Sequence, residues 1–358
     1  MIETGVLARP WIPAWILLAG TASTLFGLAW DLQWHGDVGP DTFYTLPHLF
    51  IYAGTAISGL VSLAVVLAAT GATRSGRRVD PAVGGRRVAV FGVFQAPVGY
   101  LVSGVGAASF LLYGLWDEWW HGLYGFDAVI ASPPHVGLLT SAMLVMIGSV
   151  VTCAAAGGRP WAAPALVTSV ATLLGFSMVV LVALPEVDVV DERTVVVALL
   201  SMATLACVAS YSGGLRAVLA TAGTLLAVQV TLALFSPWAT RLYAAAEGLP
   251  LRDYTDGTPR MSLLMPATLL LGAAALAVAT ALSRRSAYPW GGALGGAALA
   301  ATFPWQPVLV GTAAAPSAVE VVVTVAVGAL LGAAGGLVGE RLGAALRLLT
   351  PARTAEVV

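Results

Sequence analysis

The sequence predicts an all-α integral membrane protein, and two observations carry that prediction. The 358 residues are 58% hydrophobic and only 10% charged, whereas soluble domains carry about 25% charged residues. The apolar residues are gathered into long runs of about the 20 residues that a helix needs to cross a bilayer. A membrane β-barrel would show short alternating segments instead. The net charge of −1, without a basic stripe, gives no indication of nucleic-acid binding.

The runs predict about ten transmembrane helices, which we place at 12–34, 47–70, 97–120, 135–157, 161–184, 194–213, 216–236, 262–283, 291–311 and 318–345. The first run leads into a polar motif rather than a small-residue cleavage site, so we expect a retained span and not a signal peptide. Segment 88–98 is expected to form an interfacial helix or the kinked start of the third span. The connection from Pro237 to Pro259 is expected to be a solvated loop or a lid.

Arginine placement predicts the orientation in the membrane. Five arginines lie between Arg74 and Arg87, and with ten spans most of the others fall on the same side, which the positive-inside rule assigns to the cytoplasm. We therefore expect a plasma or inner membrane protein with both termini cytoplasmic. Residues 1–157 are expected to form two similar helical hairpins of four spans. Residues 158–358 are expected to form a Gly/Ala-rich scaffold of about six spans, because small residues let helices approach closely.

All four histidines fall inside two copies of one pattern. In each copy an Asp and a His stand four residues apart, so a helix places them on one face. A second Asp follows six residues after this His. A second His comes directly after a proline, which suits the first turn of another helix. The copies contain Asp31, Trp34, His35, Asp41 and His48, and Asp117, Trp120, His121, Asp127 and His135.

Two imidazoles and one carboxylate per copy are typical metal ligands, for copper or for non-haem iron. A bound cation would also offset the cost of an Asp near the hydrocarbon. We expect the two hairpins to pool their ligands around one dinuclear centre, or to hold one ion each. The predicted ligands are Asp31, His35, His48, Asp117, His121 and His135.

A surrounding shell is predicted from the same segments. Asp41 and Asp127 are expected to bind imidazole N–H groups from behind the ligands, or to cap the loop that follows each copy's first helix. Aromatic side chains are expected to wall the site against water, namely Trp34, Trp120, Phe43, Tyr44 and Tyr124. Two acidic residues, Glu118 and Glu320, are further candidates because intramembrane acids are often functional. Glu118, one residue round the helix from Asp117, is expected to point elsewhere.

The first copy resembles the signature of the C subunit of the copper membrane monooxygenases, the particulate methane and ammonia monooxygenase family. The likeness implies a copper site near the outer membrane face, held by Asp31, His35 and His48, with Asp41 at a further position of the family pattern. It covers about one helical hairpin. The second copy matches with one extra residue before its last His.

The chain also departs from that family. The pattern is duplicated here, and a further family site that uses an Asn and a His has no counterpart, because the chain has no Asn and only four His.

The resemblance implies a copper-dependent monooxygenase or oxidase that acts on a small apolar substrate with dioxygen. Membrane lipid, an electron donor and partner subunits would be its partners. One alternative is a non-enzymatic protein that binds or transfers copper. The chain lacks the Met-rich tracts and paired cysteines of soft Cu(I) handling, which favours chemistry. The other alternative is a non-haem iron membrane oxygenase, because two His and a carboxylate also suit Fe(II).

Overall fold

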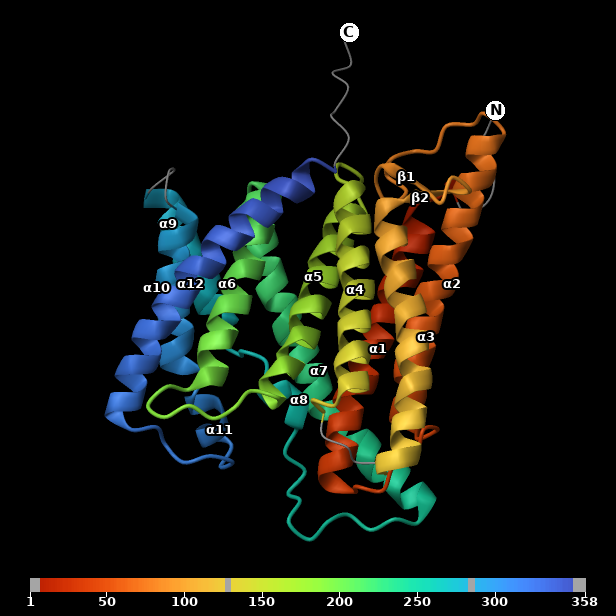
Figure 1. Ribbon diagram of the computed structural model, residues 1–358. Helices are drawn as coiled ribbons and strands as arrows, with labels where there is room; N and C mark the ends of the chain where they lie inside the picture. The colour runs from red at the N-terminus through yellow and green to blue at the C-terminus, as the bar shows by residue number, and fades with distance from the viewer. Residues whose placement is uncertain (1–6, 126–129, 283–286, 350–358) are drawn as a thin grey trace.

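The computed structural model describes residues 7–125, 130–282 and 287–349 and shows a bundle of helices that run up and down (Figure 1). Eight helices in these ranges are long and apolar enough to cross a membrane, which confirms the predicted all-α membrane class. They are α1 (Trp11–Asp37), α2 (Leu46–Arg74), α3 (Val98–Tyr124), α4 (Pro133–Ala155), α5 (Ala162–Ser177) with the 3-10 helix η2 (Met178–Val182), α6 (Glu192–Ser212), α7 (Leu215–Glu247) and α12 (Ala318–Arg347).

The expected spans 262–283 and 291–311 are each interrupted. Shorter helices stand in their place: α8 (Arg260–Leu263), α9 (Leu269–Leu282), α10 (Ala287–Thr302) and α11 (Trp305–Leu309). Gln229 of α7 donates to the carbonyls of Ser262 and Met265, both at 2.8 Å. Gln306 of α11 also donates to the Met265 carbonyl, at 2.9 Å. Because the membrane interior offers no water to a free carbonyl, these amides allow the chain to break between α8 and α9.

Two connections differ from the expectation. Segment 88–98 is not a helix but part of an antiparallel hairpin of β1 (Arg87–Val90) and β2 (Phe94–Pro97). Phe91 and Gly92 have φ values of 51° and 68°, the left-handed conformation that tight hairpin turns require. Helix α7 continues through Pro237 to Glu247, so the following connection is shorter than expected.

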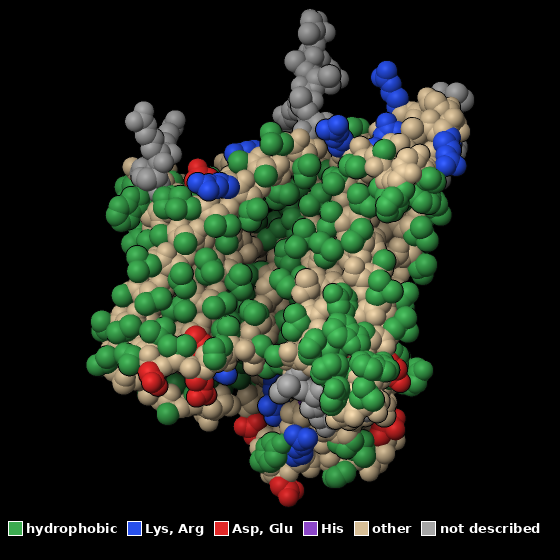
Figure 2. Space-filling view, viewed as in Figure 1, with side chains coloured by type: hydrophobic (Ala, Val, Ile, Leu, Met, Phe, Trp, Pro, Cys, Tyr) green, Lys and Arg blue, Asp and Glu red, His purple; other side chains and the backbone are tan. Residues whose placement is uncertain are grey.

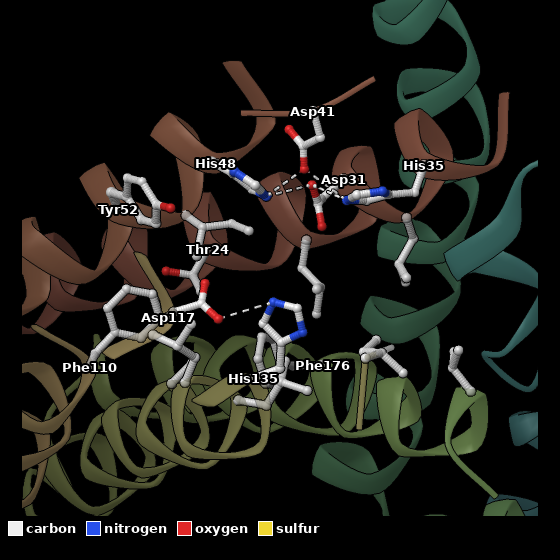
Figure 3. A pocket seen from close by; sticks show the side chains of 18 of the residues that line it. Thr24, Asp31, His35, Asp41, His48, Tyr52, Phe110, Asp117, His135 and Phe176 are labelled. Carbon is white, nitrogen blue, oxygen red and sulfur yellow. Dashed lines mark ion pairs between the residues drawn. The ribbon is translucent and has the colours of Figure 1, made fainter. Parts of the chain in front are cut away.

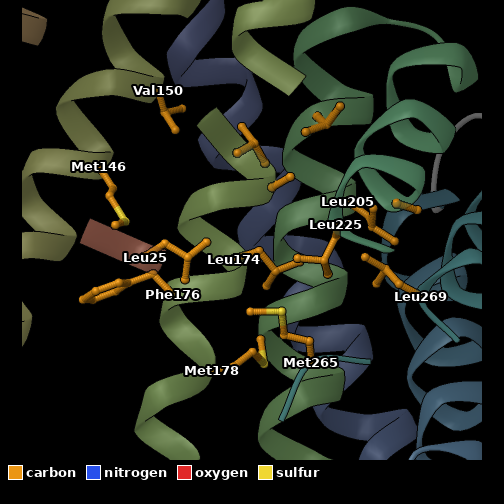
Figure 4. Packing of buried hydrophobic residues seen from close by; sticks show 14 of the residues in the cluster. Leu25, Met146, Val150, Leu174, Phe176, Met178, Leu205, Leu225, Met265 and Leu269 are labelled. Atoms are coloured by element: carbon orange, nitrogen blue, oxygen red, sulfur yellow. The ribbon is translucent and has the colours of Figure 1, made fainter. Parts of the chain in front are cut away.

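The largest apolar core lies between α1, α4, α5, α6, α7 and α9. Figure 4 shows Leu25, Leu174, Phe176, Leu225 and Leu269 packed together within it. Farther along the bundle, α10 and α12 pack through glycines, and a Cβ on Gly332 would overlap the carbonyl oxygen of Gly292. Small residues therefore set the close approach of these two helices, as expected for the later part of the chain.

The two ends of the bundle differ in charge. In Figure 2 most of the visible arginines lie at the end that carries β1 and β2, and most of the visible acidic side chains lie at the other end. Helices α1 and α3 finish, and α2 and α4 begin, at this second end (Figure 1). Both copies of the histidine pattern are therefore at the end opposite to the arginine-rich one.

Candidate metal centres

The first group of candidate ligands is built where α1 ends and α2 begins. Asp31 and His35 lie on the last turns of α1, and Pro47 opens α2 so that His48 falls in its first turn. The short connection 38–45 turns the chain back and brings the three side chains together. The Nε2 atoms of His48 and His35 lie 3.1 and 3.7 Å from Oδ1 of Asp31.

Asp41 lies among these donors and not behind them as expected. Its Oδ2 is 3.0 Å from Nε2 of His35 and 3.4 Å from Nε2 of His48, while its Oδ1 accepts the backbone N–H of Thr42. Burial alone would raise the pKa of the Asp41 carboxyl, but the hydrogen bond from His35 and the charge of His48 outweigh it and lower the pKa. Asp41 is therefore a fourth candidate ligand of the first group.

The second group repeats this arrangement where α3 ends and α4 begins. Oδ2 of Asp117 is 3.5 Å from Nε2 of His121, and Oδ1 of Asp117 is 3.3 Å from Nε2 of His135. The two Nε2 atoms are 3.4 Å apart. Asp117 and His121 are only 6% and 8% exposed, so this group is the more buried. Asp127 lies outside the described residues.

Backbone carbonyls orient one imidazole of each group. Nδ1 of His48 is 3.0 Å from the Thr42 carbonyl, and Nδ1 of His121 is 3.0 Å from the Gly125 carbonyl. A carbonyl only accepts, so Nδ1 carries the proton, and in a neutral ring Nε2 then holds a lone pair. That lone pair faces the carboxylate of its own group. Metal-binding histidines have this arrangement, with the outer nitrogen fixed by an acceptor.

The carboxylates also fit a cation. Oδ1 of Asp31 and Oδ1 of Asp117 are buried and accept no hydrogen bond of normal geometry from any described residue. A buried acceptor without a donor is costly, and a cation held between the carboxylate oxygen and the imidazole nitrogens would remove that cost. In each group the donor atoms lie within 4.8 Å of one another, which suits ligands about 2 Å from a common ion. Each donor set therefore fits a metal ion.

The two groups face one cavity of about 570 Å³. Figure 3 shows Asp31, His35, Asp41 and His48 on one wall, and Asp117 and His135 on the facing wall. The ligands form two separate clusters and not a single pooled set. Most of the remaining wall is apolar, formed by Leu28, Leu32, Ile51, Phe110, Ile130, Leu138, Leu139, Ala142, Phe176 and Val182.

Tyr52 and Arg252 are among the lining residues that were not predicted. Tyr52 follows His48 by one helical turn, and its ring centroid lies 5.9 Å from that of His48 and 6.3 Å from that of Phe110 on α3. Its spacing from His48 was a signal that could have found it. Arg252 also lines the cavity, but it comes from the distant connection after α7, and the local sequence gives no such signal.

The aromatic residues expected to wall the site are not among the described residues that line the cavity. Trp34 is 1% exposed and packs against Tyr243 of α7, with ring centroids 4.7 Å apart, outside the cavity. Its Nε1 donates to the Pro40 carbonyl at 2.7 Å. One residue along a helix is a turn of about 100°, so Trp34 cannot face the same way as His35. Trp120 packs on Tyr124, and neither these two nor Phe43 and Tyr44 are among the described lining residues.

The two additional acids lie outside both groups. Glu118 is exposed, as its position on the helix indicated. Glu320 forms a capping box with Ser317 at the start of α12: each residue's side chain accepts the backbone N–H of the other. Its role in the described structure is to begin that helix.

The connection 248–259, which we call the strap, is hydrogen-bonded to the end of α1. Gln33 donates to Oδ2 of Asp37 at 2.7 Å and to the carbonyl of Thr258 at 3.0 Å. Arg260, just after the strap, pairs with Oδ1 of Asp37 at 3.3 Å. The backbone N–H of Arg252 donates to the carbonyl of Asp37 at 2.8 Å. These bonds hold Arg252 in the cavity wall.

Comparison with protein-family models, with curated proteins and with solved structures returned no match. The fold and the site define a multi-pass membrane protein with two histidine–carboxylate groups that could each hold a metal ion.

Proposed function

We propose that this chain is a membrane metalloenzyme that uses copper to oxidise a small apolar substrate with dioxygen. One observation carries the proposal: in each group a histidine directs Nδ1 to a backbone carbonyl and Nε2 to a buried carboxylate of its own group, and the two groups line one shared cavity. The choice of copper follows the resemblance of the first group to the copper monooxygenase signature. Iron(II) is the alternative that suits the same donors.

Seven side chains would hold the metal. One ion would be bound by Asp31, His35, Asp41 and His48, and the other by Asp117, His121 and His135. Bound copper would supply the one-electron and dioxygen chemistry that no protein side chain offers. Overall, one C–H bond and one dioxygen become one C–OH group and one water, and a membrane quinol supplies two electrons and two protons as it becomes the quinone.

The protein's own residues would prepare the site. The Thr42 and Gly125 carbonyls accept the Nδ1 protons of His48 and His121, which leaves Nε2 of each ring as the nitrogen that would bind the metal. The apolar wall, which includes Phe110 and Phe176, would bind the hydrocarbon part of the substrate and exclude water.

The placement of the groups supports the predicted organisation. The same residue types stand at the same places on two consecutive hairpins, which supports a duplicated metal-binding unit in residues 1–157 and a scaffold in residues 158–358. The arginine-rich end would be cytoplasmic, with both termini there, and the metal groups would lie towards the outer face.

Metal analysis of purified protein tests the proposal. At saturating copper we expect two ions per chain, and one ion in each of the variants His35→Ala and His121→Ala. Glu118→Gln, which changes an exposed acid beside Asp117, should retain two. Loss of both ions from a single His variant would instead indicate one pooled centre. Absence of tightly bound copper or iron in the wild type would contradict the proposal.

Turnover is tested separately. Copper-loaded protein with a quinol should consume dioxygen in the presence of at least one member of a panel of hydrocarbons, amines and ammonia. Two bound coppers without oxygen consumption for any of them would favour a protein that stores or transfers the metal.

A further inference from the structure

Arg252 is the only arginine among the described residues that line the cavity. The strap fixes its backbone through the hydrogen bond to the Asp37 carbonyl. Its guanidinium lies against Gly39, where a Cβ would overlap Nη2. The absence of a side chain at residue 39 therefore leaves the room that the guanidinium occupies.

This guanidinium has no acidic partner among the described residues. Nη1 donates to the Tyr254 hydroxyl at 2.7 Å, whereas the neighbouring Arg260 pairs with Asp37. The three carboxylates of the cavity are directed at imidazoles instead. Arginine carries five N–H donors in a planar fork, which matches the two oxygens of a carboxylate. In a largely apolar cavity, such a group is suited to anchor an anionic ligand.

The net charge of the cavity with both metal ions bound also favours an anionic ligand. The described lining holds three carboxylates and one guanidinium, with the histidines counted as neutral. With two divalent ions bound, the positive charges outnumber the carboxylates. A net positive cavity with low-dielectric walls attracts anions, and a neutral hydrocarbon would gain nothing from that field.

The size and lining of the cavity limit the ligand further. A volume of about 570 Å³ lies within the range of roughly 300–1,000 Å³ that is usual for small-molecule sites. The apolar residues of the wall, Leu138 and Phe176 among them, suit a hydrocarbon chain. A phospholipid with two full acyl chains is too large for this volume, whereas a single-chain carboxylate fits.

We infer that the cavity binds a single-chain amphiphilic carboxylate, with its carboxylate on Arg252 and its chain between the two metal groups. The oxidation of this ligand rests on the proposed function, whereas its binding does not. The substrate is then an anionic amphiphile, and the C–H bond to be oxidised belongs to the chain, away from the carboxyl carbon.

The experiment compares hexanoate with hexan-1-ol, which share a chain length but differ in charge, by calorimetric titration of copper-loaded protein in detergent. We expect hexanoate to bind wild-type protein more tightly than hexan-1-ol. Arg252→Gln should weaken hexanoate by about 10- to 100-fold, the usual value of a charge-assisted pair, and leave hexan-1-ol unchanged. Arg252→Lys, which keeps the charge, should retain part of the preference.

The matched control is Arg193→Gln, which removes a charge at the start of α6, outside the lining; it should bind both probes as the wild type does. Equal binding of the two probes by wild type, or unchanged hexanoate binding in Arg252→Gln, would overturn the inference. Thermal unfolding and copper content of each variant show whether the fold is kept. The titration is repeated after chelation of the metal. If the protein binds no metal, the proposed function is refuted, but the comparison of wild type with Arg252→Gln still tests the inference.

Discussion

The hydrogen bond from Trp34 to the Pro40 carbonyl leads to a quantitative prediction about the first metal group. Connection 38–45 carries Asp41, and Trp34 Nε1 is bonded to its backbone at 2.7 Å. Trp34→Phe keeps an aromatic ring against Tyr243 but removes the donor. A neutral hydrogen bond contributes about 0.5–1.5 kcal/mol net. If the whole of that free energy orders the connection, the equilibrium constant for holding Asp41 in place falls by about twofold to tenfold. Copper affinity falls by the same factor where ion binding is what orders the connection.

The assay is a competition titration with a chromophoric copper chelator, in backgrounds that leave one group intact. In the His121→Ala background, which reports the first group, Trp34→Phe should weaken copper by about twofold to tenfold. In the His35→Ala background, which reports the second group, it should change nothing. Trp120→Phe is the matched control, because Trp120 Nε1 has no hydrogen bond to a described residue. Equal losses at both groups, or no loss at the first, would refute the reasoning.

Two further predictions concern pH and packing. Copper affinity should weaken progressively as the pH falls from 8 to 5, because protons compete with the metal for the imidazole nitrogens. Asp41, whose carboxyl pKa is lowered from its usual value of 3.8, should add no step in that range. An affinity that does not change between pH 8 and pH 5 would contradict the assigned ligands. Gly332→Ala should destabilise the protein by about 1–3 kcal/mol in thermal unfolding, because the new methyl would overlap the Gly292 carbonyl. Gly223→Ala, on an open helix face, should be neutral or stabilising, and an equal loss in both variants would exclude the packing explanation.

Much of the fold follows from local sequence. The run predicted at 12–34 became Trp11–Asp37, because hydropathy alone identifies a span. The broken spans carried a signal that hydropathy does not weigh: Pro266 lies between α8 and α9, and Pro304 lies between α10 and α11. A proline within an apolar run ends or kinks a helix. Gln229 and Gln306, whose amides bind the free carbonyls between α8 and α9, come from other helices. The sequence around these glutamines does not indicate that contact.

Part of the candidate site could likewise be predicted from local sequence, and part could not. The Asp-x3-His spacing and the Pro-His step place ligands by helix geometry, so they could be predicted. Asp41 stands in an irregular connection without periodicity, and its position depends on how that connection folds back. Arg252 reaches the cavity only because its strap is bonded to Asp37, a contact between segments far apart in the chain.

If each group binds one ion as proposed, the shared cavity couples the binding of the two ions. Like charges on opposite walls of a space of low polarity repel, and water screens them poorly there. The ion that enters first raises the electrostatic cost of the second, so the occupancies cannot be independent even though no ligand is common to both. A chain with one ion would then be a distinct species at limiting copper, and an entering anion that offsets the repulsion would promote binding of the second ion.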